Sequence, residues 1–154
     1  MQPSSSGPGA AVKTTVSGRM LAIIVTRGTS NDLFQVATLV RAATALEMGV
    51  RVLFRADAAE KLRKERVNVP EWAPIYRLVE PQLMERLKAA EFEDMATFLQ
   101  EAKEHGDGVE FWVAQETIDD RQLDLGDLIG LTDGAITEAA FRERTRPAFA
   151  LLVF

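Results

Sequence analysis

The chain has 154 residues, of which 47% are hydrophobic, and this is enough to bury the core of one ordinary domain. Its 18 basic and 23 acidic residues give a formal net charge of -5, and no basic run is long enough to follow a phosphate backbone. Nucleic acid is therefore not expected as a partner. The absence of cysteine excludes disulfides, thiolate metal sites and any thiol chemistry by this chain.

The single histidine, His105, lies in a polar stretch that is typical of a solvated helix end, where the helix dipole favours a histidine. A histidine-based metal site or a Ser-His-Asp triad would have to use this one ring. We therefore expect neither a metal site nor a bound cofactor.

Residues 1–18 are rich in serine, glycine and proline, so we expect a disordered tail, followed by a single α/β domain over residues 19–154. No stretch approaches the ~20 apolar residues of a membrane span, and no signal sequence is apparent. A cytoplasmic location is the expectation.

Residues 20–26 form a continuous apolar run, as expected for a strand that is covered on both faces. The polar stretch that follows contains Gly28, which permits a tight turn, and several residues that can cap a helix. Residues 32–48 have helical spacing and end at Gly49. The apolar residues Phe34, Leu39 and Leu46 lie off the main stripe of this helix, which indicates contacts on more than one side.

Residues 50–56 are predicted to be a second strand, parallel to the first because a helix connects the two. Residues 57–66 indicate a short charged helix, and three prolines make residues 67–81 an irregular connection. Pro81 suits the first turn of a new helix. Two helices, or one bent helix, are expected over residues 83–102.

The remaining segments complete an α/β pattern, and they comprise strands at 109–114, near 135–137 and at 149–154, with a helix at 138–144. The pattern predicts a three-layer α/β/α sandwich with a mainly parallel, five-stranded sheet. In such sheets, binding and catalytic groups gather where the strands end. Three segments should converge there, namely residues 27–31, 55–57 and 114–120.

These three segments carry only weak signals of chemistry. The first has neither a dinucleotide-binding glycine pattern nor a phosphate-loop lysine, so an ordinary capped turn is the simpler interpretation. A carboxylate pair for acid/base catalysis could be drawn from Glu116, Asp119 and Asp120. Solvated turn residues are the better interpretation, since nothing in the sequence specifies burial.

Several short motifs resemble the DsrE/DsrF-like family of small sulfur-relay proteins. They are Thr26-Arg27-Gly28-Thr29, Ala45-Leu46-Glu47-Met48-Gly49, Val52-Leu53-Phe54, Phe111-Trp112-Val113-Ala114-Gln115-Glu116-Thr117 and Asp127-Leu128-Ile129. In active members of that family, an aromatic-containing strand leads into Cys-Gln and a nearby Ser or Thr, and the cysteine carries a persulfide. The resemblance places Ala114 at the cysteine position and matches Gln115 and Thr117 to the family pattern.

An alanine methyl cannot attack or hold sulfane sulfur, so the resemblance implies a member without the family's chemistry. We expect a non-catalytic interaction or scaffold subunit, assembled as a trimer or hexamer, with sulfur-relay proteins as possible partners. The alternatives are a binding protein for a small anionic or nucleotide-like ligand, an enzyme of another kind, and an inactivated or engineered sulfurtransferase. The candidate cleft consists of Arg27, Gly28, Thr29, Ala114, Gln115 and Thr117.

Overall fold

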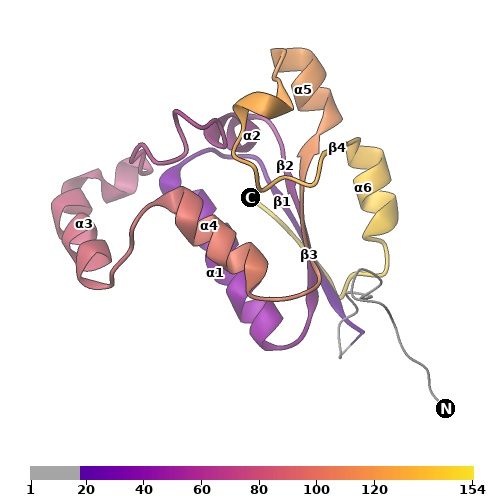
Figure 1. Cartoon of the computed structure of the whole chain (residues 1–154), viewed down its shortest axis with the longest axis horizontal. Coiled ribbons are helices and arrows are strands. Elements are labelled where there is room, and N and C mark those ends of the chain that lie inside the picture. The colour runs from indigo at the N-terminus through magenta and orange to yellow at the C-terminus, as the bar shows by residue number, and fades with distance from the viewer. Residues whose placement is uncertain (1–17) are drawn as a thin grey trace.

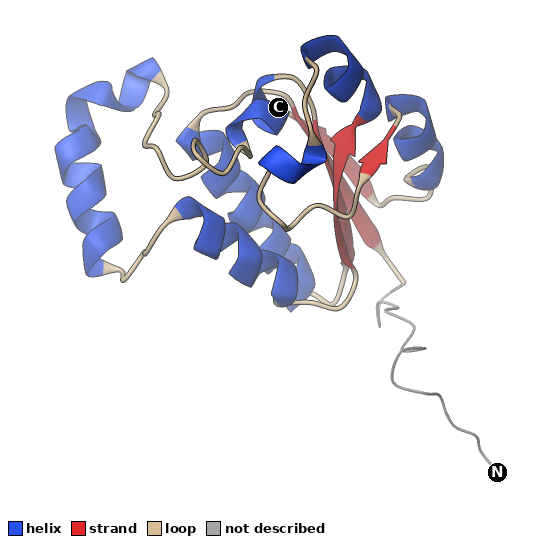
Figure 2. Cartoon of the chain, turned by 45° about the horizontal axis from the view of Figure 1, so that its top comes forward, coloured by secondary structure: helices blue, strands red, loops and turns tan. Residues whose placement is uncertain are grey.

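A computed structural model describes residues 18–154 and contains a five-stranded sheet in the order β4-β3-β2-β1-β5, with every neighbouring pair parallel (Figures 1 and 2). The strands are β1 (Met20–Val25), β2 (Gly49–Phe54), β3 (Val109–Ala114), β4 (Ala135–Ile136) and β5 (Ala150–Val153). The predicted α/β fold with its parallel sheet is confirmed.

The largest part of the core lies between the sheet and two helices, α1 (Ser30–Ala45) and α4 (Met95–Glu104), which cover the same face (Figure 1). Alternate side chains of the strands, such as Ile23 and Val52, point into this layer and are fully buried. The off-stripe residue Phe34 has a clear role, because its ring stacks on Phe98 of α4 at a centroid distance of 4.8 Å.

The opposite face of the sheet is covered more thinly, by α6 (Glu138–Arg144) (Figure 1). Phe141 of α6 is buried against Ile24, Leu53 and Ala114, which form a second and much smaller apolar cluster. The sheet therefore has helices on both faces, but the two layers are unequal in thickness.

A helical arm projects from the body of the domain between β2 and β3 (Figure 1). It consists of the 3₁₀ helix η1 (Pro74–Val79) and of α3 (Glu80–Ala89), and neither contains a buried residue. Pro81 lies in the first turn of α3, as predicted, and α3 is a separate helix from α4. Leu78 on the arm is 90% exposed.

The structure differs from the sequence expectation directly after β3, where α5 (Gln115–Arg121) replaces the expected polar turn. Only two of its seven residues, Thr117 and Ile118, are apolar or β-branched. They are adjacent and not three or four residues apart, so the sequence has no helical periodicity there. The charged helix α2 (Asp57–Lys61) is shorter than residues 57–66, and a 3₁₀ turn, η2 (Leu125–Asp127), was not predicted.

The expected tail at residues 1–18 lies outside the described residues except for Gly18. Among residues 18–154, none of the helices is both long enough and apolar enough to cross a bilayer.

Candidate functional site

The loops that follow β1 and β2 touch each other at the carboxyl edge of the sheet. A Cβ atom on Gly28 would lie 2.3 Å from the carbonyl oxygen of Asp57, so only glycine fits between the two loops. The backbone N–H of Ala58 donates to the carbonyl of Thr26 over 2.9 Å and fixes the same contact. The loops after β1 and β2 therefore meet, as predicted, and their contact is formed by backbone atoms.

The loop after β2 is strained and is tied to α5. Ala56 has φ 51° and ψ -128°, a backbone conformation that a residue with a Cβ seldom adopts. Its N–H donates to the hydroxyl of Thr117 over 2.9 Å, and Thr117 is 8% exposed. The hydroxyl that matches the family pattern therefore serves as a structural hydrogen-bond acceptor.

Ala114 is the last residue of β3 and the N-cap of α5. The residue is 2% exposed and packs with Ile24, Leu53 and Phe141 in the smaller apolar cluster. Gln115, the next residue, directs its amide along α5 and donates to Asp119 over 2.9 Å. The Ala114 side chain thus faces packed apolar groups.

The carboxylates considered for acid/base work are solvent-exposed on α5: Glu116, Asp119 and Asp120. The Glu116 carboxylate accepts from the backbone N–H of Glu138 at 3.1 Å, across to the start of α6. This contact holds α5 and α6 side by side, and it satisfies an N–H group at a helix start that has no partner within the helix.

An arginine at the end of β2 links three elements at this edge. The Nε of Arg55 donates to the Thr26 hydroxyl over 2.9 Å, and its Nη1 donates to Glu138, which also pairs with Arg142. Burial raises the pKa of Glu138, but the hydrogen bonds from Arg55 and Arg142 outweigh it, so the pKa lies below its ordinary value. Glu138 is therefore held as a carboxylate.

The other cations that line this edge are also paired. Arg27 lies 3.3 Å from the buried Asp32 carboxylate, and Arg121 lies 2.8 Å from Asp57. Asp32 also accepts from Thr29 in the capping box of α1. The hydrogen bond from Arg121 to Asp57 raises the pKa of the guanidinium. Each of the arginines Arg27, Arg55 and Arg121 at the carboxyl edge is thus paired with a carboxylate.

A fully buried lysine was not predicted from the sequence. Lys61 ends α2, has 0% exposure, and donates to the carbonyls of Arg66 and Val69 and to the carboxylate of Glu71. Burial lowers the pKa of the Lys61 ammonium, while the Glu71 hydrogen bond acts against this. All three N–H groups have acceptors, so this lysine organises the loop that follows it.

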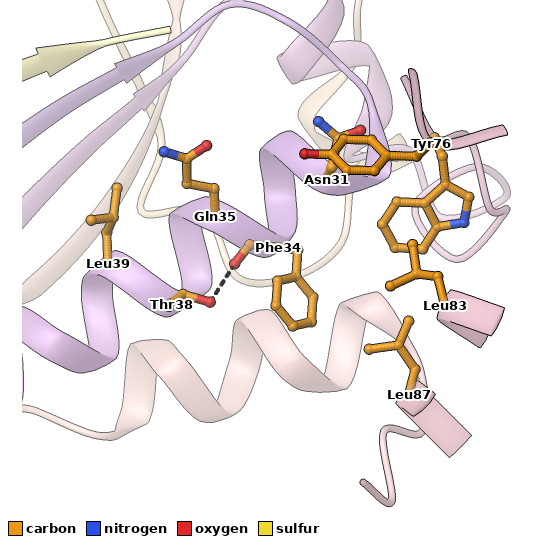
Figure 3. Close-up of a pocket in the computed structure, with 9 residues that line it drawn as sticks. Asn31, Phe34, Gln35, Thr38, Leu39, Tyr76, Leu83 and Leu87 are labelled. Atoms are coloured by element: carbon orange, nitrogen blue, oxygen red, sulfur yellow. Dashed lines mark hydrogen bonds between the residues drawn. The ribbon is translucent and has the colours of Figure 1, made fainter. Parts of the chain in front are cut away.

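A cavity of about 400 Å³ lies between α1 and the arm, and of the three carboxyl-edge segments only 27–31 contributes to its lining, through Asn31 (Figure 3). Nine side chains line it: Asn31, Phe34, Gln35, Thr38, Leu39, Trp72, Tyr76, Leu83 and Leu87. Sequence reasoning did not assign a site here, although the aromatic residues in the proline-broken segment were a signal that this connection packs against something.

No group of three or more histidine, cysteine, aspartate or glutamate side chains in residues 18–154 has the arrangement of a metal site. His105 follows α4 as its C-cap, is exposed, and lies 2.6 Å from the Thr44 hydroxyl through Nδ1.

No protein-family model matches the chain, and no curated protein matches it in sequence. Among solved structures, the chain is similar to a protein of unknown function, MTH1491 from Methanobacterium thermoautotrophicum. The TM-score is 0.57 at 13% identity, with 88% of this chain and 99% of that chain covered. At this level of identity, the similarity establishes a shared α/β fold.

Proposed function

We propose that the protein is a non-catalytic, self-associating interaction subunit of the DsrE/DsrF-like type. The observation that carries the proposal is the Ala114 position, where the family's thiol is replaced by a buried methyl group in a chain without any cysteine. A persulfide carrier needs a thiolate, and neither an amide nor a hydroxyl without a base can replace it. The motif resemblance supports the sulfur-relay context.

The polar edge of the sheet gives less support to the alternative of a small-anion or nucleotide-like ligand at the strand ends. Arg27, Arg55 and Arg121 each face a carboxylate, so an incoming anion would have to displace an existing partner. The Gly28 contact also brings the two loops together at the point where a phosphate group would enter.

Self-association is supported by the outer edge of the sheet. Within the sheet, β5 pairs with β1 alone, and its side chains Leu151, Leu152 and Val153 are 43%, 36% and 52% exposed. An exposed apolar edge strand favours pairing with another chain. We assign this edge to contact with a second copy of the chain, in a trimer or hexamer.

The oligomer is tested by light scattering and native mass spectrometry at micromolar concentration. We expect a trimeric or hexameric mass for the natural sequence and a smaller species for Leu151→Lys, because a charge at the edge opposes close pairing. Leu78→Lys is the matched control, since Leu78 is 90% exposed on the arm and lies outside the sheet. A monomeric natural protein would contradict the proposal.

The absence of sulfur chemistry is tested on the same samples. After incubation with polysulfide, the chain should show no mass gain of sulfur, whereas a cysteine-bearing DsrE/DsrF-like protein should gain it. When the two proteins are mixed, native mass spectrometry should detect a complex that contains both chains. Covalent uptake of sulfur by this chain would overturn the non-catalytic assignment.

A further inference from the structure

The cavity between α1 and the arm has the chemistry of a site for an uncharged molecule. None of its nine lining residues is acidic or basic, although 27% of the whole chain is charged. Its volume of about 400 Å³ falls within the range of small-molecule sites, which is roughly 300–1,000 Å³. Figure 3 shows Phe34 of α1 facing Leu83 and Leu87 of α3, so apolar groups form two opposing walls.

The wall that contains Trp72 is fixed in place by hydrogen bonds on both sides of that residue. The backbone N–H of Ser30 donates to the Glu71 carbonyl over 2.7 Å, and the Glu71 N–H donates to the Ser30 hydroxyl over 2.8 Å. After Trp72, the Ala73 N–H donates to the Asn31 side chain over 2.9 Å. The α1 wall and the Trp72 wall are therefore rigid relative to each other.

The polar groups of the cavity lining differ in how accessible they are. The indole Nε1 of Trp72 is buried without a hydrogen-bond acceptor, and Trp72 as a whole is 9% exposed. A buried tryptophan N–H normally finds an acceptor, and leaving that hydrogen bond unmade is unfavourable. The side-chain amide of Gln35 and the Tyr76 hydroxyl also line the cavity, and both residues are exposed, so these polar groups are accessible to a molecule in the cavity.

We propose that this cavity binds an uncharged, mainly apolar small molecule that carries a hydrogen-bond acceptor. The apolar walls would enclose its rings or chain, and the Gln35 amide and the Tyr76 hydroxyl, which line the cavity, are the donors available to its acceptor. The third wall, α3, has no buried residue of its own, so a bound molecule would add apolar contacts that the arm lacks.

The test uses a pair of fluorescent probes with the same ring system, on the full chain. N-phenyl-1-naphthylamine is uncharged, and 1-anilinonaphthalene-8-sulfonate carries one negative charge on the same arylamine. We expect saturable binding of the uncharged probe, and affinity for the sulfonate weaker by about tenfold or more, because the cavity has no cation to compensate a buried charge.

A matched pair of variants on the arm locates the site. Leu83→Lys places a charge in the cavity and should lower the affinity for the uncharged probe by about tenfold or more. Leu78→Lys makes the same change at a residue that is 90% exposed and does not line the cavity, and it should bind like the natural sequence. Gln35→Trp fills the cavity from the exposed face of α1 and should also abolish binding, without any change to the arm.

A second readout places the probe beside one tryptophan. The chain has two, so Trp112→Phe leaves Trp72 alone, and its emission should fall in step with probe binding. Any of three results would overturn the proposal. These are the absence of saturable binding of the uncharged probe, equal binding of it by Leu83→Lys and Leu78→Lys, and an emission of Trp72 that does not change when the probe binds. Circular dichroism of each variant verifies that it is folded.

Discussion

Replacing Lys61 by methionine should destabilise the domain, because this ammonium group has three acceptors and no contact with solvent. Its Nζ lies 3.1 Å from the Arg66 carbonyl, 2.6 Å from the Val69 carbonyl and 2.5 Å from Glu71 Oε1. Methionine is similar in length and flexible enough to fill the space, so the change removes the charge and the donors while it preserves much of the packing.

The size of the effect follows from the groups that lose a partner. Glu71 keeps Arg66, whose Nε lies 3.1 Å away, so its carboxylate does not become an unpaired buried charge. Two backbone carbonyls lose a charged donor, at about 1–3 kcal/mol each. Arg66 is partly exposed and Val69 is exposed, so water can replace part of the lost hydrogen bonding to their carbonyls. We therefore take the lower end of this range for each carbonyl. The expected loss is about 2–3 kcal/mol.

Urea denaturation followed by circular dichroism measures this loss, and a thermal melt should show a Tm lower by about 8 °C. Lys64→Met is the matched control, because Lys64 lies three residues away and is exposed. Its stability should change by less than about 0.5 kcal/mol. If Lys61→Met were as stable as Lys64→Met, the buried ammonium would have no net stabilising role, and the reasoning would be refuted.

Two further predictions concern the carboxyl edge and its charges. Gly28→Ala should lower the free energy of unfolding by about 1–3 kcal/mol, since the added Cβ would meet the backbone carbonyl of Asp57. Gly130→Ala is the control, because nothing lies within 4 Å of its added Cβ, and it should melt like the natural sequence. Equal losses of stability in the two variants would refute the close contact at Gly28. The pKa values of Glu71 and Glu138 are lowered from the ordinary glutamate value, so their contribution to stability is present above that value and is lost as the pH falls through the lowered pKa values. Glu138→Gln should therefore flatten the fall in unfolding free energy as the pH drops below the ordinary glutamate pKa, and Glu143→Gln, on an exposed residue, should not.

The elements that the sequence predicts well are those whose signals are local. The strand β3 begins and ends at the predicted residues, since an apolar run there is bounded by glycines on one side and polar residues on the other. The helix α6 also has the predicted bounds, and Thr137 caps it by accepting from the Ala140 N–H over 3.1 Å. The parallel order follows from the helical crossovers.

The features that the sequence did not predict depend on contacts between distant segments. The helix α5 is anchored by Thr117, which bonds to Ala56 at a separation of 61 residues. Lys61 looks like one charge of a solvated helix, because its acceptors come from a loop that the fold brings back over it. The cavity beside Trp72 likewise exists because the arm returns toward α1.

The Ala114 position can be tested directly by Ala114→Cys. From the sequence alone, a retained pocket would make this thiol more reactive than an exposed control; the structure points to the opposite order. Ala114 is 2% exposed among apolar side chains, and burial there raises the pKa of a thiol. The start of α5 acts in the other direction, because helix N-termini lower thiol pKa values, but a reagent must still reach the sulfur.

We therefore expect Ala114→Cys to fold, with a loss of at most about 1–3 kcal/mol from the added sulfur atom in a packed cluster. Its alkylation should be slower than that of Ala89→Cys, which makes the same substitution at an exposed residue of α3. Denaturant should bring the two rates together, since the difference comes from burial. Faster alkylation of the folded Ala114→Cys variant, with uptake of sulfur from polysulfide, would mean that the edge opens to reagents. In that case one substitution would restore a sulfur-accepting site, and a recently inactivated sulfurtransferase would explain the chain better than a scaffold subunit.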